Sequence, residues 1–132
     1  MASIFTRIIN REIPAHIVAE DDNHIAFLDI NPLAKGHCLA IPKVEVDYIF
    51  DLDDELLCEL HLFAKKVAKG IEKVISCQRI GVEVIGTEVP HAHIHLIPLN
   101  EIDDMNFSKP KLCLESDELT KIAKDISKAI ES

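Results

Sequence analysis

Three histidines within five residues mark the stretch of this chain best suited to chemistry. His91, His93 and His95 alternate with apolar residues between Pro90 and Pro98. In an extended strand, alternate side chains lie on opposite faces, so the three imidazoles are expected to share one face while their neighbours enter the core. Rings spaced roughly 6.5 to 7 Å apart along a strand could contact one substrate group together. The cluster therefore predicts a functional site.

Two kinds of chemistry suit such a cluster. Histidines alternating on a strand fit zinc or iron, with Glu83 or Glu88 as an oxygen ligand, but no C-x-x-C or H-E-x-x-H spacing accompanies them. A neutral imidazole is also a nucleophile toward phosphorus near neutral pH, and neighbouring imidazoles can donate to phosphoryl oxygens. Like charges keep the three rings from being protonated together. The middle one, His93, is the expected nucleophile.

The rest of the chain predicts the elements that hold these histidines. Helices are expected at 2–10, with Ser3 as N-cap, at about 53–76 and at about 116–130. Strands are expected at 16–19, 24–28, 37–42, 79–85 and 89–99, the last two as an antiparallel hairpin. This order predicts an α+β fold, in which an antiparallel five-stranded sheet packs against a long helix and the N- and C-terminal helices.

Composition narrows the classes of protein that fit. The 132 residues and 14.8 kDa fit a single domain over 1–132, and 48% hydrophobic with 28% charged residues is typical of a globular chain. A formal net charge of −9 disfavours nucleic acid and anionic membranes as partners. Arg7 and Arg11 interrupt the first apolar stretch, and no 18-residue apolar run occurs. We expect a cytoplasmic protein with neither nucleic-acid nor membrane partners.

The histidine stretch also resembles a known family. The sequence His-Ala-His-Ile-His-Leu-Ile at 91–97 fits the His-φ-His-φ-His-φ-φ signature of histidine triad (HIT) proteins, where φ is apolar. Further segments are similar to the Hint-like bacterial branch: Ile4-Phe5, Ile8-Ile9, Glu12-Ile13-Pro14, Glu20-Asp21-Asp22, Ala26-Phe27, Asp29-Ile30, Pro32 and Ile41-Pro42-Lys43. The resemblance covers most of a core at about 3–99, which leaves a C-terminal extension with a helix at about 101–132.

The resemblance implies a homodimer that binds purine nucleotides of the AMP or GMP type. It implies hydrolysis at the nucleotide α-phosphorus, often of a phosphoramidate, through a nucleotidyl-histidine on His93 and without a cofactor. His91 and His95 match the flanking residues, Asp29 matches the carboxylate that accepts the ribose hydroxyls, and histidine rather than glutamine at 95 indicates the hydrolase side of the family. Further nucleotide-binding positions of the family fall on residues of this chain. The walls of the base pocket match Phe5, Ile8, Ile13, Phe27 and Ile30, and the loop before the triad contributes Gly86 and Glu88.

Two departures from the family pattern modify these expectations. Many bacterial relatives bind zinc through two cysteines, a histidine and the first triad histidine. The first three of these positions are Ser3, Thr6 and Glu45 in this chain, so the zinc site is expected to be absent. Before the triad, Glu88 replaces a side chain that helps the leaving group or phosphate, and a carboxylate there repels phosphate unless it is protonated or turned away. It would suit a basic leaving group such as lysine. A dinucleoside polyphosphate hydrolase, a nucleotide-binding regulatory module with vestigial activity and a metalloprotein remain as alternatives.

Overall fold

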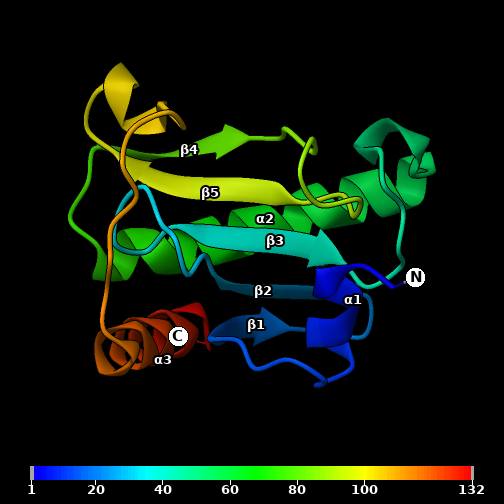
Figure 1. Ribbon diagram of the computed structural model, residues 1–132, viewed down its shortest axis with the longest axis horizontal. Helices are drawn as coiled ribbons and strands as arrows, with labels where there is room; N and C mark the ends of the chain where they lie inside the picture. The colour runs from blue at the N-terminus through cyan, green and yellow to red at the C-terminus, as the bar shows by residue number, and fades with distance from the viewer. Residues whose placement is uncertain (1, 132) are drawn as a thin grey trace.

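The computed structural model describes residues 2–131, which form an antiparallel sheet covered by helices (Figure 1). The strands are β1 (Ile17–Glu20), β2 (His24–Leu28), β3 (Cys38–Pro42), β4 (Arg79–Glu83) and β5 (Ile94–Leu99). The helices are α1 (Ile4–Ile9), α2 (Asp54–Val74) and α3 (Ser116–Glu131), with short 3-10 turns η1 (Ile49–Asp51) and η2 (Ile102–Met105). Neighbouring strands are antiparallel in the order β1-β2-β3-β5-β4. The predicted α+β fold is confirmed.

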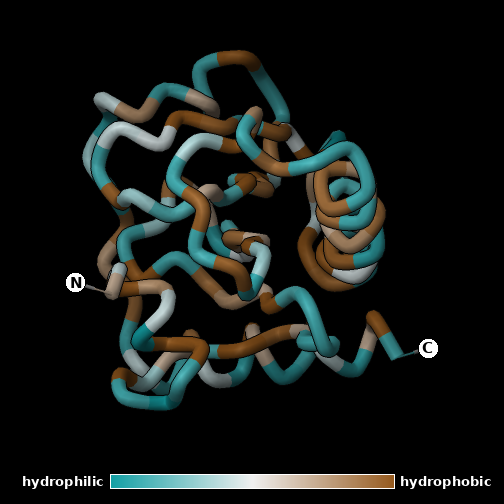
Figure 2. Tube along the Cα trace, turned by 90° about the vertical axis from the view of Figure 1, so that its right-hand side faces the viewer, coloured by the Kyte–Doolittle hydropathy of each residue, from teal (hydrophilic) through white to brown (hydrophobic). Residues whose placement is uncertain are grey.

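Different helices pack on the two faces of the sheet. One face packs its apolar residues, such as Ala26, Ala40 and Ile94, against α2 and α3 in the main core. The opposite face forms a second cluster of Phe5, Ile8, Ile25, Phe27, Leu39 and Ile41. In the hydropathy-coloured trace, hydrophobic and hydrophilic residues alternate around the helical coils (Figure 2). Because α1 supplies two members of the second cluster, it covers the face away from α2.

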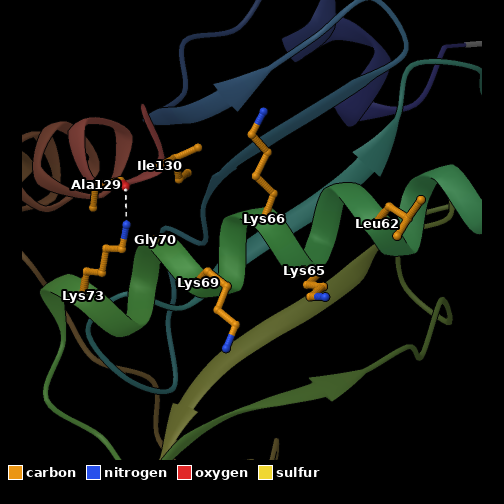
Figure 3. A pocket seen from close by; sticks show the side chains of 8 residues that line it. All are labelled: Leu62, Lys65, Lys66, Lys69, Gly70, Lys73, Ala129 and Ile130. Atoms are coloured by element: carbon orange, nitrogen blue, oxygen red, sulfur yellow. Dashed lines mark hydrogen bonds between the residues drawn. The ribbon is translucent and has the colours of Figure 1, made fainter. Parts of the chain in front are cut away.

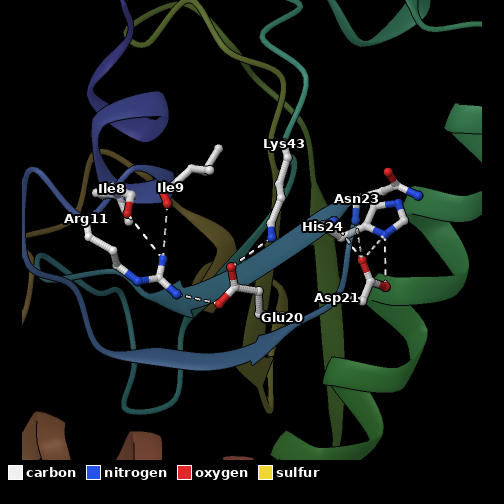
Figure 4. A network of polar contacts seen from close by, with 8 residues as sticks. All are labelled: Ile8, Ile9, Arg11, Glu20, Asp21, Asn23, His24 and Lys43. Atoms are coloured by element: carbon white, nitrogen blue, oxygen red, sulfur yellow. Dashed lines mark hydrogen bonds and ion pairs between the residues drawn. The ribbon is translucent and has the colours of Figure 1, made fainter.

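The short helix α1 is held at both ends by side chains. At its start, the Ser3 Oγ accepts a hydrogen bond from the Thr6 N–H at 3.1 Å, as an N-cap does. Beyond its end, Arg11 has a left-handed backbone with φ of 62° and donates to the carbonyls of the last turn. The Arg11 guanidinium also lies 2.5 Å from Glu20, whose other oxygen is 2.8 Å from the Lys43 ammonium (Figure 4). This network joins α1 to β1 and to the end of β3.

The strand predicted at 89–99 is wrong at its start, because β5 begins only at Ile94. Pro90 has no N–H to give a strand ladder, and the His91 N–H turns back to the Val89 carbonyl at 2.8 Å. The Ala92 N–H then donates to the Val46 carbonyl at 2.7 Å, in the loop after β3. Of the three histidines, His95 alone lies within the strand, so a strict alternation of faces does not describe the triad.

A groove between α2 and α3 lies on the side of the sheet away from α1 (Figure 3). It has a volume of about 310 Å³, and its lining consists of Leu62, Lys65, Lys66, Lys69, Gly70, Lys73, Ala129 and Ile130. The helices approach closely at Gly70, where an added Cβ would lie 2.3 Å from Cγ1 of Ile130. None of the helices between residues 2 and 131 has the length and apolarity needed to cross a membrane.

Candidate functional site

The three histidines of the triad gather around the start of β5, on the face that α1 covers. His91, His93 and His95 are buried, with exposed fractions of 0%, 7% and 8%. The rings of His93 and His95 meet edge to face with centroids 5.0 Å apart, closer than the spacing expected along a strand. His95 pairs with Leu39 across the β3–β5 ladder, and directly paired residues share a face. The triad therefore lies beside the second hydrophobic cluster.

The surroundings of His93 determine which of its two ring nitrogens carries the proton. Its Nδ1 lies 2.7 Å from the His91 carbonyl oxygen, which only accepts, so Nδ1 carries the proton. A neutral imidazole then keeps its lone pair on Nε2. The Phe5 ring stands nearly perpendicular to the His93 ring, at 84° with centroids 5.0 Å apart, and limits its rotation. Nε2 of His93 is thus a fixed nucleophilic atom.

A fourth imidazole, His37, completes the site and was missed from the sequence. Its Nδ1 accepts from the Leu33 N–H at 3.0 Å, so its Nε2 is protonated and donates to Nδ1 of His95 at 3.0 Å. His95 consequently holds its own proton on Nε2. Burial lowers the pKa of His37 to about 3 and that of His95 to about 4, with a smaller contribution from the neighbouring imidazoles. Both rings are neutral hydrogen-bonding groups near pH 7.

His91 serves as an anchor between α1 and the loop after β3. Its Nε2–H donates to the Pro42 carbonyl at 2.8 Å, and its Nδ1 accepts from the Ser3 hydroxyl at 2.9 Å. Oε1 of Glu45 accepts from the Thr6 hydroxyl at 2.5 Å and from the Ser3 N–H at 2.7 Å. The hydrogen bond from Thr6, followed by that from Ser3, lowers the pKa of Glu45 to about 2. Both ring nitrogens of His91 are therefore occupied.

These groups do not fit a zinc ion. Zinc in proteins takes thiolates, imidazoles and carboxylates, whereas Ser3 and Thr6 offer hydroxyls to His91. Among residues 2–131, the side chains of Asp29, His37 and His95 form a second group, with ligand atoms within 4.8 Å of one another. There the lone pair of His37 already accepts from the Leu33 N–H, and its proton points at His95. Neither group presents a ready set of ligands.

Asp29 lies at the end of β2 beside the His37–His95 pair. Its Oδ1 accepts from the Asn31 N–H at 2.9 Å, and its Oδ2 is 3.6 Å from Nε2 of His37. Burial raises the pKa of Asp29, the negative charge of Glu88 adds to this rise, and the side chain is 22% exposed. The carboxylate of Asp29 is therefore partly accessible, with one oxygen bound by the Asn31 N–H and the other facing the His37 ring.

The structure brings together most of the residues expected to bind the base. Phe5, Ile8 and Phe27 are buried members of the second cluster, and Ile13 packs against it. Ile30 is 63% exposed, so its place as a base-pocket wall stays a prediction. Through Phe5, which meets the His93 ring, this buried apolar cluster lies directly beside the site.

The loop between β4 and β5 carries the departures from the family pattern. Gly86 has a φ of 77°, a left-handed conformation that glycine adopts readily. Glu88 is exposed, yet its charge acts on Asp29. The carboxylate of Glu88 therefore faces solvent within electrostatic reach of the site.

Phe107, in the segment between η2 and α3, also reaches the site. Its ring meets the His95 ring at 71° with centroids 4.9 Å apart. The surrounding coil has no periodic pattern that could have placed this phenylalanine from the sequence.

Comparisons with known proteins agree with this arrangement. A family model described as "HIT domain" matches residues 10–102. An uncharacterised HIT-like protein of Borreliella burgdorferi is 36% identical over 132 residues, which cover 94% of this chain and 95% of that protein. An adenosine 5′-monophosphoramidase of Saccharomyces cerevisiae is 34% identical, over 98% of this chain and 84% of the relative.

Solved structures show the same fold. A Hit-like protein from Bartonella henselae matches with a TM-score of 0.83 and 34% identity, over 96% of this chain and 95% of that one. A hypothetical histidine triad nucleotide-binding protein from Sulfolobus tokodaii matches with a TM-score of 0.82 and 31% identity, over 96% and 91% of the two chains.

Proposed function

Because the chain belongs to the HIT domain family, we propose that it is a nucleotide hydrolase that cleaves a bond at the α-phosphorus of a purine nucleotide. The observation that carries the proposal is the fixed tautomer of His93, whose Nδ1–H is bound by the His91 carbonyl at 2.7 Å. The name of the yeast relative, an adenosine 5′-monophosphoramidase, supports a nucleoside phosphoramidate as the substrate class.

In the first step of the proposed reaction, Nε2 of His93 attacks phosphorus. The bond from phosphorus to the leaving amine breaks, and the amine departs with the bonding pair after taking a proton from solvent water. The resulting nucleotidyl-histidine carries a positive ring, which the His91 carbonyl stabilises through the Nδ1 hydrogen bond. The Nε2–H of His95 donates to a phosphoryl oxygen. Water then attacks phosphorus and gives up a proton to solvent, the bond to His93 breaks with its pair returning to Nε2, and the nucleoside monophosphate is released.

The rest of the nucleotide is proposed to lie along the second cluster. The Asp29 carboxylate would accept hydrogen bonds from the ribose hydroxyls. It has acceptor capacity to spare, because only its Oδ1 accepts a hydrogen bond, from the Asn31 N–H. The base would pack on Phe5, Ile8, Ile13, Phe27 and Ile30, with Gly86 and Glu88 in the loop above. Glu88 is exposed, and its charge favours a basic leaving amine over an anionic one.

Hydrolysis of adenosine 5′-phosphoramidate, followed by AMP release, tests this function. We expect His93→Ala to lower kcat by several orders of magnitude, roughly 10³ or more, as loss of a covalent nucleophile does. His61→Ala is the matched control, because His61 is exposed on α2 and bonded to its own helix. Acid-labile labelling of His93 by the nucleotide would report the intermediate. No AMP release from the unaltered protein would refute the proposal.

A nucleotide-binding module with little turnover is the second candidate, favoured by Glu88 in the loop before the triad. Binding of AMP that survives His93→Ala, without hydrolysis of phosphoramidate or diadenosine polyphosphate, would favour it. Faster hydrolysis of diadenosine polyphosphate than of phosphoramidate would favour the dinucleoside polyphosphate hydrolase.

The homodimer, the cytoplasmic location and the single domain over 1–132, with a core at 3–99 and an extension at 101–132, are part of the proposal. Light scattering of the purified chain tests the dimer directly.

A further inference from the structure

The segment that joins η2 to α3 lies against the histidine site. We name residues 106–112 of this segment the strap. Its Phe107 ring contacts His95 edge to face at 4.9 Å, and it also meets the His37 ring at 80° with centroids 6.3 Å apart. Both imidazoles of the hydrogen-bonded pair therefore share one aromatic neighbour. The matched HIT domain ends at residue 102, so the strap lies beyond it.

The strap is fastened to the loop that follows Asp29. The Leu112 N–H donates to the Pro32 carbonyl at 2.8 Å, which joins the strap to the loop between β2 and β3. The Lys111 ammonium donates to the carbonyls of Phe107 and Lys109, the latter at 3.0 Å. These bonds fold the strap back on itself and hold the ammonium 6.0 Å from the centre of the Phe107 ring. The positions of ring and ammonium are thus coupled.

Lys111 adds a positive charge to a site whose other charged groups are carboxylates. The protein has a net charge of −9, and two carboxylates, Asp29 and Glu88, act within the site. Burial raises the pKa of Asp29 and lowers that of His37, and the charge of Lys111 lowers both. A nucleotide phosphate entering this negative environment is therefore attracted by Lys111 in particular.

We propose that the strap is a wall of the nucleotide site, in which Phe107 positions His95 and Lys111 attracts the phosphate of the ligand. The inference rests on the proposed function, because it takes a nucleotide as the ligand. Phe107 acts through His95 and is a positioning residue. Lys111 acts on the ligand through its charge, and its ammonium is kept in place by the carbonyls of the strap.

Calorimetric titration with AMP and with adenosine tests the role of Lys111. We expect Lys111→Gln to weaken AMP binding about two- to fivefold at low salt, the range for an exposed charge pair, and less at high salt. Adenosine, which lacks phosphate, should bind Lys111→Gln and the unaltered protein equally. Lys109→Gln is the matched control, because Lys109 is paired with Asp103 at 3.2 Å in the same segment. Equal AMP affinity of Lys111→Gln and the unaltered protein would overturn this role.

NMR of the His95 ring nitrogens tests the role of Phe107. His95 is shielded by the Phe107 ring, while the rings of His93 and His37 and the carboxylate of Asp29 face it from the other elements around it. We expect Phe107→Leu to raise the pKa of His95 and reduce its Nε2–H tautomer, and Phe107→Tyr to restore both. A merely structural role would lower the melting temperature and leave the His95 signals unchanged, and that result would overturn the positioning role.

The two proposals fail separately. If the unaltered protein releases no AMP from phosphoramidate but Lys111→Gln still weakens AMP binding selectively, the proposed chemistry fails and the strap inference holds. If hydrolysis occurs but AMP binding by Lys111→Gln and the His95 signals of Phe107→Leu are unchanged, the strap inference fails and the chemistry holds.

Discussion

Two substitutions of His37 separate its two hydrogen bonds. In His37→Asn, the amide oxygen falls near the position of Nδ1 and can accept from the Leu33 N–H, but the donor to His95 is lost. In His37→Gln, the amide nitrogen falls near the position of Nε2 and can donate to His95, but the acceptor for Leu33 is lost. The first variant removes the bond that fixes the His95 tautomer, and the second removes the bond that holds the loop.

The size of each effect follows from the burial of the groups. A hydrogen bond contributes about 1 kcal/mol net, which corresponds to roughly a fivefold preference for one tautomer of His95. His37→Asn is therefore expected to lower kcat/KM about five- to tenfold, and His37→Gln by less than about twofold. Each variant leaves one buried polar group unpaired, because His37 is 1% exposed. Each should lose about 1 to 3 kcal/mol of unfolding free energy.

Phosphoramidate hydrolysis and urea unfolding of the same three proteins measure both effects. The expected pattern is similar stability loss in the two variants with unequal activity loss. Equal kcat/KM for His37→Asn and His37→Gln would refute the assignment of a tautomer-fixing role, whichever stability they show.

Three further predictions concern pH, metal binding and packing. The two imidazoles with pKa values of about 3 and 4 stay neutral in the folded chain but take up protons below pH 6.5 when it unfolds. The free energy of unfolding should therefore fall by up to about 3 to 4 kcal/mol from pH 7 to pH 5. The raised pKa of Asp29 partly opposes this fall. Urea titrations at each pH measure the free energy of unfolding, and a flat pH profile would contradict the prediction. The triple variant Ser3→Cys, Thr6→Cys, Glu45→His should bind one zinc ion by elemental analysis and gain about 2.7 kcal/mol of stability at 100 times its Kd, and a chelator should remove this gain. Gly70→Ala should destabilise the chain by about 1 to 3 kcal/mol although alanine favours helices, because its Cβ would lie 2.3 Å from Cγ1 of Ile130. The same change should cost less in an Ile130→Ala background, which lacks that Cγ1; a more stable single variant would contradict this reasoning.

The elements that follow from local patterns were predicted well. The long helix was expected at about 53–76 and spans Asp54–Val74, because its apolar stripe and acidic N-cap are local signals. The Ser3 cap of α1 is confirmed for the same reason. The start of β5 was wrong because the apolar alternation was extended through Pro90, which cannot donate to a ladder.

The site residues that were missed depend on contacts distant in sequence. His37 and His95 are 58 residues apart and meet because β3 pairs with β5 rather than with β4. The hairpin pattern at β4 and β5 gave no indication of which strand lies on the other side. Phe107 comes from irregular coil, where neither periodicity nor capping fixes a side chain. Long-range pairing of strands therefore decides what local patterns leave open.

Helix α1 has a consequence for how the site opens. It has six residues, too few for a helix to persist in water by itself. It is retained by the hydrogen bonds around His91 and by the contacts of Phe5 and Ile8. We expect its amide hydrogens to exchange through local opening, at a lower free energy than those of α2. A base resting on Phe5 would slow this exchange, so the exchange rate of the α1 amide hydrogens would report whether a ligand occupies the proposed base pocket.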